Sequence, residues 1–315
     1  APHTARCPRR PGERLRLPCP FRGMFATPFV RPMSSPAPAP APARIAVRPG
    51  SLDAWRIAIR TRTLWIATVP VFVGTSFAYL ESGRVDVLFA SLALVASVLL
   101  QAIANLQNDV GYTARGAETG TRVGLPRATS SGLLTPREVR LAIALAVAAT
   151  ILIGLPLMAR WGMPVLAMGL ASIAAALGYM GGPRPIAYTP LGELLVFVFF
   201  GLIAVAGSGY IQLGEVTPAL LVAGTAIGLL AAAVLVVNNH RDIDHDATTG
   251  RRTFGVIFGA RASAGLYAVL MLCPFAAVPA LVWLADSYLL WLPLAAFPGA
   301  VGLVRALPQT PPGLA

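Results

Sequence analysis

Residues 219–246 read ALLVAGTAIGLLAAAVLVVNNHRDIDHD, an apolar run that passes directly into amides, acids and histidines. The apolar part is close to the roughly 20 residues that a helix needs to cross the hydrocarbon core of a bilayer. Acids and amides are costly at a membrane boundary, where they usually mark a functional site. The stretch therefore predicts a membrane-spanning helix that ends in such a site.

A second apolar run leads into a similar polar cluster, Asn105-Leu-Gln-Asn108-Asp109. Residues three and four positions apart share one face of a helix. Asn105, Asn108 and Asp109 are therefore expected to present their oxygens together. Asp242 and Asp246 are expected to do the same in the other cluster, and two such faces can hold one magnesium-bound diphosphate.

The composition is that of a membrane protein, because 56% of the 315 residues are hydrophobic and only 12% are charged. Apolar stretches of spanning length are the second indication. They run over residues 63–80, 87–108, 139–158, 162–180, 191–210, 219–238, 263–284 and 288–304. We therefore expect an all-α, polytopic transmembrane bundle of about eight spans with a central cavity open to the cytoplasmic side.

All 25 basic residues are arginine, and their placement orients the bundle. Only Arg84 and Arg160 lie in the short loops on one side; the others lie before the first span, in the alternate loops and in the C-terminal tail. Arginine excess marks the cytoplasmic side, so both termini and both polar clusters are expected at the cytoplasmic face of the inner membrane. The net charge of +12 reflects this topology, and no basic folded domain is available to bind nucleic acid.

Three regions follow from the composition. Residues 1–50 are rich in Pro, Ala and Arg and are expected to be disordered. Because the chain does not begin with methionine, while Met24 and Met33 follow, the interpretation of part of this tail as a gene-model artefact stays open. Residues 51–305 are the expected transmembrane domain, and 306–315 are an expected polar tail.

The second and sixth spans both end in a polar cluster and continue into long arginine-containing loops. This suggests two four-helix halves whose similar helix ends converge on one cavity. At the entry to the third span, Thr135-Pro136-Arg-Glu138 predicts a capping box with proline at the first helical position.

Five runs, in this order, resemble the UbiA superfamily of intramembrane aromatic prenyltransferases, most closely its 1,4-dihydroxy-2-naphthoate polyprenyltransferase branch of menaquinone synthesis. The similarity covers about residues 53–305, and the ordered set is specific although each run is weak alone. The runs are Arg60-Thr-Arg62-Thr-Leu with Pro70 and Gly74; Asn105-Leu-Gln-Asn108-Asp109; Gly181-Gly-Pro-Arg184-Pro with Tyr188 and Leu191-Gly-Glu193-Leu; Asn238-Asn-His-Arg241-Asp242 through Asp246; and Gly250-Arg251-Arg252-Thr253.

The resemblance implies a polyprenyl diphosphate donor, an aromatic acceptor with 1,4-dihydroxy-2-naphthoate as the expected one, and Mg²⁺ in a bilayer-embedded enzyme; no protein partner is implied. Breaking an allylic carbon–oxygen bond leaves a diphosphate anion and a carbocation, so metal and arginine are needed at the leaving group. Mg²⁺ prefers oxygen ligands and bridges phosphates through one or two carboxylates. Guanidinium groups match phosphate oxygens.

The expected site residues follow from this chemistry. Catalytic residues and metal ligands are Asp109, Asp242 and Asp246, with Asn105 and Asn108 as further metal ligands. Substrate-binding residues are Asn105, Asn108, Asn239, Arg62, Arg122, Arg127, Arg251, Arg252, Tyr112 and Tyr179.

The chain departs from the family pattern at two points. The first motif usually carries a second aspartate three residues after the first, and Tyr112 holds that place here. Binding is therefore expected to rely more on the second cluster, while a different acceptor or metal stoichiometry and an impaired protein stay open. The family typically has nine helices, whereas this sequence reaches Leu307-Pro-Gln-Thr-Pro-Pro-Gly after the eighth. Two interpretations stay open: this sequence is truncated, or the ninth helix is missing.

Simpler structural interpretations stay open for several of these residues. Asn105 and Asn108 can serve as interhelical hydrogen-bonding groups, and Asp244 lies off the face that Asp242 and Asp246 share. His240 and His245 can be exposed or can support other side chains without binding a metal. Arg251 and Arg252 can serve only to mark the cytoplasmic side, and Glu193 can pair with Arg184.

Two other functions stay open. One is prenyl transfer to a different aromatic acceptor. The other is divalent-cation transport, for which polar residues at mid-membrane depth in several spans would be expected. The acids instead lie at helix ends on one side, which favours an enzyme.

Overall fold

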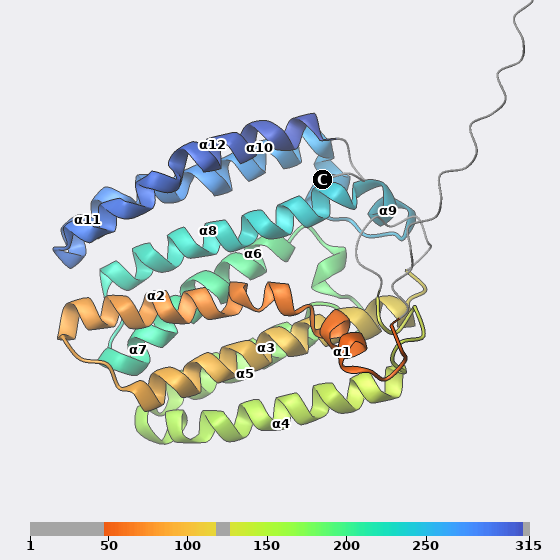
Figure 1. The fold of residues 1–315 in the computed structure, drawn as a ribbon, viewed down its shortest axis with the longest axis horizontal. Helices are drawn as coiled ribbons and strands as arrows, with labels where there is room; N and C mark the ends of the chain where they lie inside the picture. The colour runs from red at the N-terminus through yellow and green to blue at the C-terminus, as the bar shows by residue number, and fades with distance from the viewer. Residues whose placement is uncertain (1–46, 118–126, 311–315) are drawn as a thin grey trace, which may run out of the picture. The chain divides into compact units, whose positions relative to one another are not determined.

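The computed structural model describes residues 47–117 and 127–310, and these are built from helices without strands (Figure 1). The segments that correspond to the eight expected spans are α2 (Trp65–Ser82), α3 (Val87–Ala114), α4 (Pro136–Trp161), α5 (Met163–Gly178), α6–η3–α7 (Gly192–Val196, Phe197–Ala206, Gly207–Leu213), α8 (Pro218–Arg241), α10–α11 (Phe254–Ala276, Val278–Ala285) and η4–α12 (Tyr288–Ala296, Phe297–Ala306). Short elements complete the fold: α1 (Leu52–Ile59), η1 (Thr61–Thr63), η2 (Ile186–Tyr188), α9 (Ile243–Thr248) and η5 (Leu307–Gln309).

Over the described ranges, seven of these segments are long and apolar enough to cross a membrane. The eighth, α5, has 16 residues, which is roughly 24 Å at 1.5 Å per residue. The expected helical bundle is therefore confirmed. Two segments are longer than expected: α3 continues through its polar cluster to Ala114, and α10 begins at Phe254 and kinks at Gly259, where φ is 83°.

Local signals place the helix ends. The predicted capping box is present, because Glu138 N donates to Thr135 Oγ1 at 3.2 Å and Thr135 N donates to Glu138 Oε2 at 2.7 Å. The Asp86 side chain caps α3. The Thr217 side chain caps α8, and Pro218 is the first residue of that helix. Each cap satisfies backbone N–H groups that have no partner within the helix.

Five pairs of packed segments hold the bundle together. Helix α3 packs on α4, and α8 packs on both η3 and α10, while α2 packs on η3 and α7. In Figure 1, α4 lies at one edge and α10–α12 lie at the other. The helices between them, α2, α3 and α5–α8, supply most of the wall of a central cavity.

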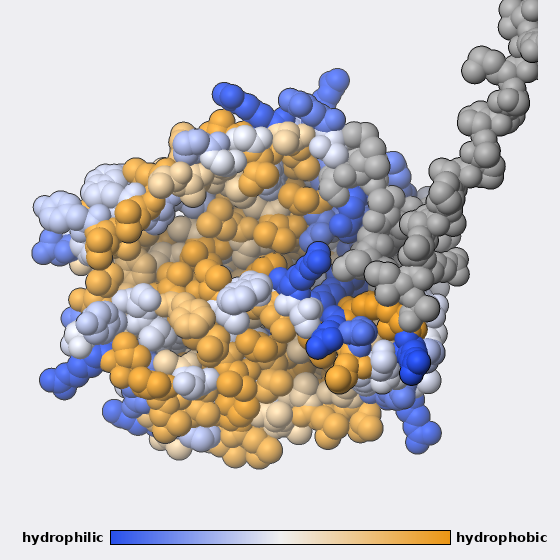
Figure 2. All heavy atoms as spheres, in the orientation of Figure 1, coloured by the Kyte–Doolittle hydropathy of each residue, from blue (hydrophilic) through white to orange (hydrophobic). Residues whose placement is uncertain are grey.

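The surface has the polarity that a bilayer requires. Figure 2 shows apolar side chains in a broad band around the middle of the helices, with hydrophilic side chains gathered at their ends. Leu88, Leu145, Leu152, Trp283 and Leu289 are all more than 60% exposed. An apolar surface this continuous is unfavourable in water, so the chain is a multi-pass membrane protein.

The contact between η3 and α8 depends on glycines at Gly201, Gly224 and Gly228. A Cβ atom on Gly201 would lie 2.6 Å from Gly228 Cα and still closer to the carbonyl oxygen of Gly224. Small residues of this kind let membrane helices approach closely.

We expect Gly201→Ala to lower the free energy of unfolding by about 1–3 kcal/mol, because the helices must separate to accept a methyl group. Thermal unfolding of the detergent-solubilised protein measures this. The matched control is Gly265→Ala in α10, where a Cβ atom meets nothing within 4 Å. Equal melting temperatures for the two variants would show that this helix contact is not tightly packed.

Candidate active site

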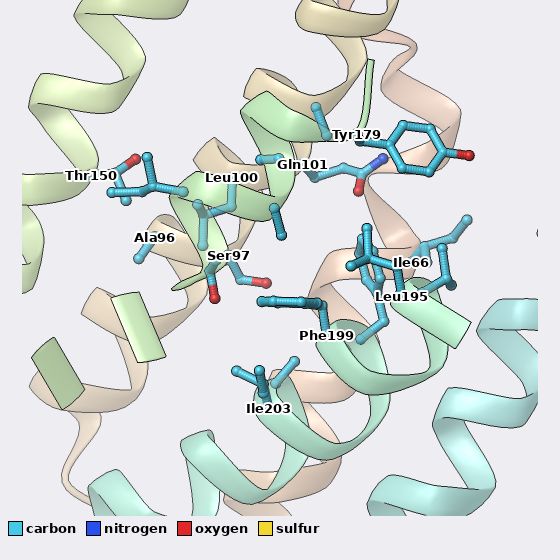
Figure 3. A pocket seen from close by; sticks show the side chains of 18 of the residues that line it. Ile66, Ala96, Ser97, Leu100, Gln101, Thr150, Tyr179, Leu195, Phe199 and Ile203 are labelled. Carbon is cyan, nitrogen blue, oxygen red and sulfur yellow. The ribbon is translucent and has the colours of Figure 1, made fainter. Parts of the chain in front are cut away.

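A cavity of about 450 Å³ lies among α2–α8. Most of its wall is apolar, and Figure 3 shows Leu100, Leu195, Phe199 and Ile203 around this part. The polar side chains that line it belong mainly to the ends of α3 and α8 and to the loops beside them: Asn105, Asn108, Tyr112, Arg127, Asn238, Asn239, Arg241, Asp242 and Arg251. The cavity therefore combines a hydrocarbon-like wall with a charged end.

Tyr112 is the centre of the charged end. Its side chain is only 3% exposed, and the Arg127 guanidinium carbon lies 3.8 Å from the centroid of its ring. The Arg251 guanidinium carbon lies 5.3 Å from the same centroid. Both distances suit cation–π attraction. Tyr112 thus holds the guanidinium groups of two arginines beside the cavity.

Asp246 forms a buried ion pair with one of these arginines. Arg251 donates to Asp246 Oδ1 at 2.6 Å and to the Ala187 carbonyl oxygen at 3.1 Å. The Asp246 side chain has no exposed surface, and that of Arg251 is 5% exposed. Burial raises the pKa of the Asp246 carboxyl, and the adjacent Arg251 guanidinium opposes that rise. Asp246 therefore fixes Arg251 and does not itself line the cavity.

Asp242 does line the cavity. Helix α8 ends at Arg241, so Asp242 stands at the junction between α8 and α9. Its two carboxylate oxygens accept from Arg241 at 2.7 and 2.9 Å. Among the acidic side chains in the described part of the chain, it is the only one in the cavity wall. Asp244 is exposed, as the sequence predicted.

The carboxylate of Asp109, which its motif predicts to be a metal ligand, contacts the protein backbone in this structure. Its carboxylate accepts from the backbone N–H groups of Ala128 at 2.8 Å and Thr129 at 2.9 Å, and from the Thr129 hydroxyl. Asp109 is 2% exposed and lies outside the cavity wall. It anchors the segment that begins at Arg127 and so helps to place that guanidinium.

The amide side chains of the two motifs also differ in their hydrogen bonds. Asn105 donates to the Ile59 carbonyl oxygen at 2.6 Å, which is the interhelical bonding that the sequence left open. Asn239 donates to Glu193 Oε1 at 2.8 Å, so Glu193 is bonded to an amide of α8. Asn108 lines the cavity, and its Oδ1 is buried without a hydrogen-bond partner among the described residues.

Of the remaining predicted site residues, some line the cavity and others do not. Tyr179 lines the cavity, and burial raises the pKa of its phenol. Arg62 and Arg252 are exposed and lie outside the wall. Arg122 falls outside the described residues, as do the tails 1–46 and 311–315.

Arg60 is a cavity residue that sequence reasoning did not select. It belonged to the first motif together with Arg62, but no helical periodicity can choose between them. The chain leaves α1 at Arg60, where φ is 54°. Gln101 was also missed, because it lies in an apolar run one helical turn before the motif.

The histidines are structural in this arrangement. His245 Nε2 lies 2.9 Å from the Ala117 carbonyl oxygen, and both His240 and His245 are buried. Within the ranges that the structure covers, no three His, Cys, Asp or Glu side chains converge as a metal cluster would require. Asp242, Asn105 and Asn108 are the predicted oxygen ligands that lie in the cavity wall.

Helical spans around an apolar cavity with a charged end are the architecture of a membrane-embedded enzyme. The chain belongs to the UbiA prenyltransferase family, whose sequence model matches residues 67–310.

Similar proteins include the 1,4-dihydroxy-2-naphthoate octaprenyltransferase of Escherichia coli (strain K12), 39% identical over 66% of this chain and 69% of that protein. The protein of the same name from Haemophilus influenzae is 33% identical over 78% of this chain and 84% of its own length. A solved UbiA homologue from Archaeoglobus fulgidus, bound to DMAPP and Mg²⁺, is 15% identical and matches with a TM-score of 0.64 over 82% of this chain and 88% of that one. This last likeness concerns the fold.

Proposed function

We propose that this protein transfers a polyprenyl group from a polyprenyl diphosphate to 1,4-dihydroxy-2-naphthoate, with Mg²⁺, in menaquinone synthesis. The observation that carries the proposal is one cavity with an apolar wall and an end formed by Arg127, Arg251 and Asp242. The names of the relatives in Escherichia coli and Haemophilus influenzae support the choice of acceptor. Mg²⁺ in the Archaeoglobus fulgidus homologue supports the choice of metal.

The apolar wall would hold the prenyl chain, and the arginines would face the diphosphate. When the allylic carbon–oxygen bond breaks, its electron pair leaves with the diphosphate, whose charge Arg127 and Arg251 stabilise. An aromatic ring carbon of the acceptor then supplies the electron pair of the new carbon–carbon bond. The ring becomes aromatic again when that carbon loses its other substituent, which is a proton or, at the carboxyl-bearing carbon, the carboxyl group as CO2. Phe199 and Tyr179 in the wall help to exclude water from the allylic cation.

The chemistry that Mg²⁺ supplies when bound is neutralisation of the departing diphosphate. The residues that fit this ion are Asp242 and Asn108, since both line the cavity and the Asn108 Oδ1 is buried without a partner. Oxygen donors of these two kinds are what Mg²⁺ selects.

We also propose that the charged end faces the cytoplasm across the inner membrane. The arginine-rich loops of the sequence support this orientation. A donor lipid in the cytoplasmic leaflet would then present its diphosphate directly to this end of the cavity.

The test is product formation in membranes that contain the full chain. We expect a prenylated naphthoate product from labelled polyprenyl diphosphate and 1,4-dihydroxy-2-naphthoate, lost on addition of EDTA and restored by Mg²⁺ or Mn²⁺. Membranes without the protein are the control. Product with another aromatic acid alone would reject the assigned acceptor, turnover in EDTA would reject the metal, and no product with any acceptor would reject the function.

A further inference from the structure

Gln101 places a hydrogen-bond acceptor without a partner inside the apolar part of the cavity. It lies on α3, lines the cavity and is 9% exposed (Figure 3). Its Oε1 is buried and has no hydrogen-bond partner within residues 47–117 and 127–310. An amide oxygen in such a place costs free energy unless something bonds to it, so its presence requires an explanation.

The direction of the Gln101 amide is set by its neighbours. The carbonyl oxygen of Ile59 can only accept, so the group that contacts it at 2.6 Å is the Asn105 nitrogen. The Asn105 oxygen therefore faces Gln101, and it accepts from Gln101 Nε2 at 3.2 Å. Reversing the Gln101 amide would bring two oxygens together.

Thr63 supports the same direction. Its hydroxyl donates to the Arg60 carbonyl oxygen at 2.9 Å, which leaves its lone pairs to accept. They accept from Asn105 Nδ2 at 2.9 Å and from Gln101 Nε2 at 3.4 Å. Two backbone carbonyl groups thus orient the whole network, and Gln101 Oε1 is the atom that it leaves for the cavity.

The atom that bonds to Gln101 Oε1 must be a hydrogen-bond donor. Of the two substrates in the proposed function, the prenyl diphosphate offers a hydrocarbon chain and ionised phosphate oxygens, which at neutral pH supply acceptors. The hydroxyl groups of the aromatic acceptor are donors. Gln101 lies seven residues before Asn108 on the same face of α3, roughly 10 Å along the helix axis, and so is separate from the diphosphate end.

We infer that Gln101 is a specificity-determining residue whose Oε1 accepts a hydrogen bond from a hydroxyl group of the aromatic acceptor. This inference rests on the proposed function. A few polar groups in an apolar pocket commonly fix the orientation of a ligand. A pocket with an unpaired acceptor also rejects an analogue that lacks the matching hydroxyl.

The experiment compares kcat/KM for the dihydroxynaphthoate with kcat/KM for each of the two naphthoates that lack one hydroxyl. We expect the wild-type protein to disfavour one of these analogues by about 10- to 100-fold. In Gln101→Met, which has similar length and no amide, we expect that ratio to be about 10- to 100-fold smaller than in the wild-type protein. The intrinsic reactivity of each ring is the same for both proteins and cancels when their ratios are compared.

Two further variants separate recognition from structure. Gln101→Leu repeats the removal of the amide with a second apolar side chain. Thr63→Val breaks the same network but leaves Gln101 Oε1 in place, so it is expected to retain the preference.

An unchanged ratio in both Gln101→Met and Gln101→Leu would overturn the inference, as would a Thr63→Val ratio that falls as far as theirs. Either result leaves the proposed function standing, because product still forms. Absence of product from the wild-type protein with every aromatic acceptor would instead reject the function and the inference with it.

Discussion

Asp242→Asn is expected to reduce turnover by at least about a hundredfold while leaving the protein folded. Asp242 is the one acidic side chain that the described structure places in the cavity wall, at the junction of α8 and α9. Loss of its negative charge would weaken the proposed Mg²⁺ site, and metal stabilisation of a leaving group contributes several kcal/mol. Each 1.4 kcal/mol corresponds to a factor of ten in rate.

Steady-state turnover and a Mg²⁺ titration of the purified protein measure this effect. Asp244→Asn is the matched control, since Asp244 lies two residues further along the chain and is exposed. We expect it to retain most of the activity. Similar losses in the two variants would mean that the charge of the whole segment matters and that no single carboxylate binds the metal.

The second large effect is expected at the buried pair of Asp246 and Arg251. Asp246→Leu leaves the Arg251 guanidinium buried without its carboxylate, and removing one member of such a pair typically costs about 3–5 kcal/mol. We therefore expect Asp246→Leu to lower the melting temperature strongly. In the double variant, Asp246→Leu with Arg251→Met, much of this stability should return because neither charge remains.

Activity and stability should separate in that double variant. Arg251 lines the cavity, so its loss is expected to leave the protein inactive even when it is stably folded. The control is Arg56→Met, which breaks an exposed pair with Asp53 whose side chains are 67% and 66% exposed. Exposed pairs contribute about 0–1 kcal/mol. If the melting temperature of Asp246→Leu were no lower than that of Arg56→Met, the buried pair of Asp246 and Arg251 would not stabilise the fold.

The helices and many of their boundaries could be predicted because their causes are local. A segment in hydrocarbon must satisfy its own backbone hydrogen bonds, so an apolar run of spanning length becomes a helix. The capping residues then set where it begins, as Thr135 and Glu138 do for α4. Helix α3 is longer than expected because hydropathy falls before its helical structure ends.

The membership of the site was predicted only in part. Tyr112, Arg127, Asp242 and Arg251 are brought to one cavity, in agreement with the motifs that contain them. Arg62 and Arg252 are exposed, and Arg60 lines the cavity instead of its neighbour. A motif gives the residue types that a site needs, but the direction of each side chain depends on where the helix before it ends.

The sequence was sufficient for a bundle of apolar helices with two polar clusters at their ends, because bilayer solvation and helix capping act on neighbouring residues. Tertiary structure decided the use of the three aspartates. Asp109 is occupied by the backbone of Ala128 and Thr129, and Asp246 by Arg251, while Asp242 lines the cavity. The partners of Asp109 and Asp246 belong to other segments of the chain. A carboxylate pairs with the donors that the folded loops bring closest. The periodicity of a single helix does not specify those donors.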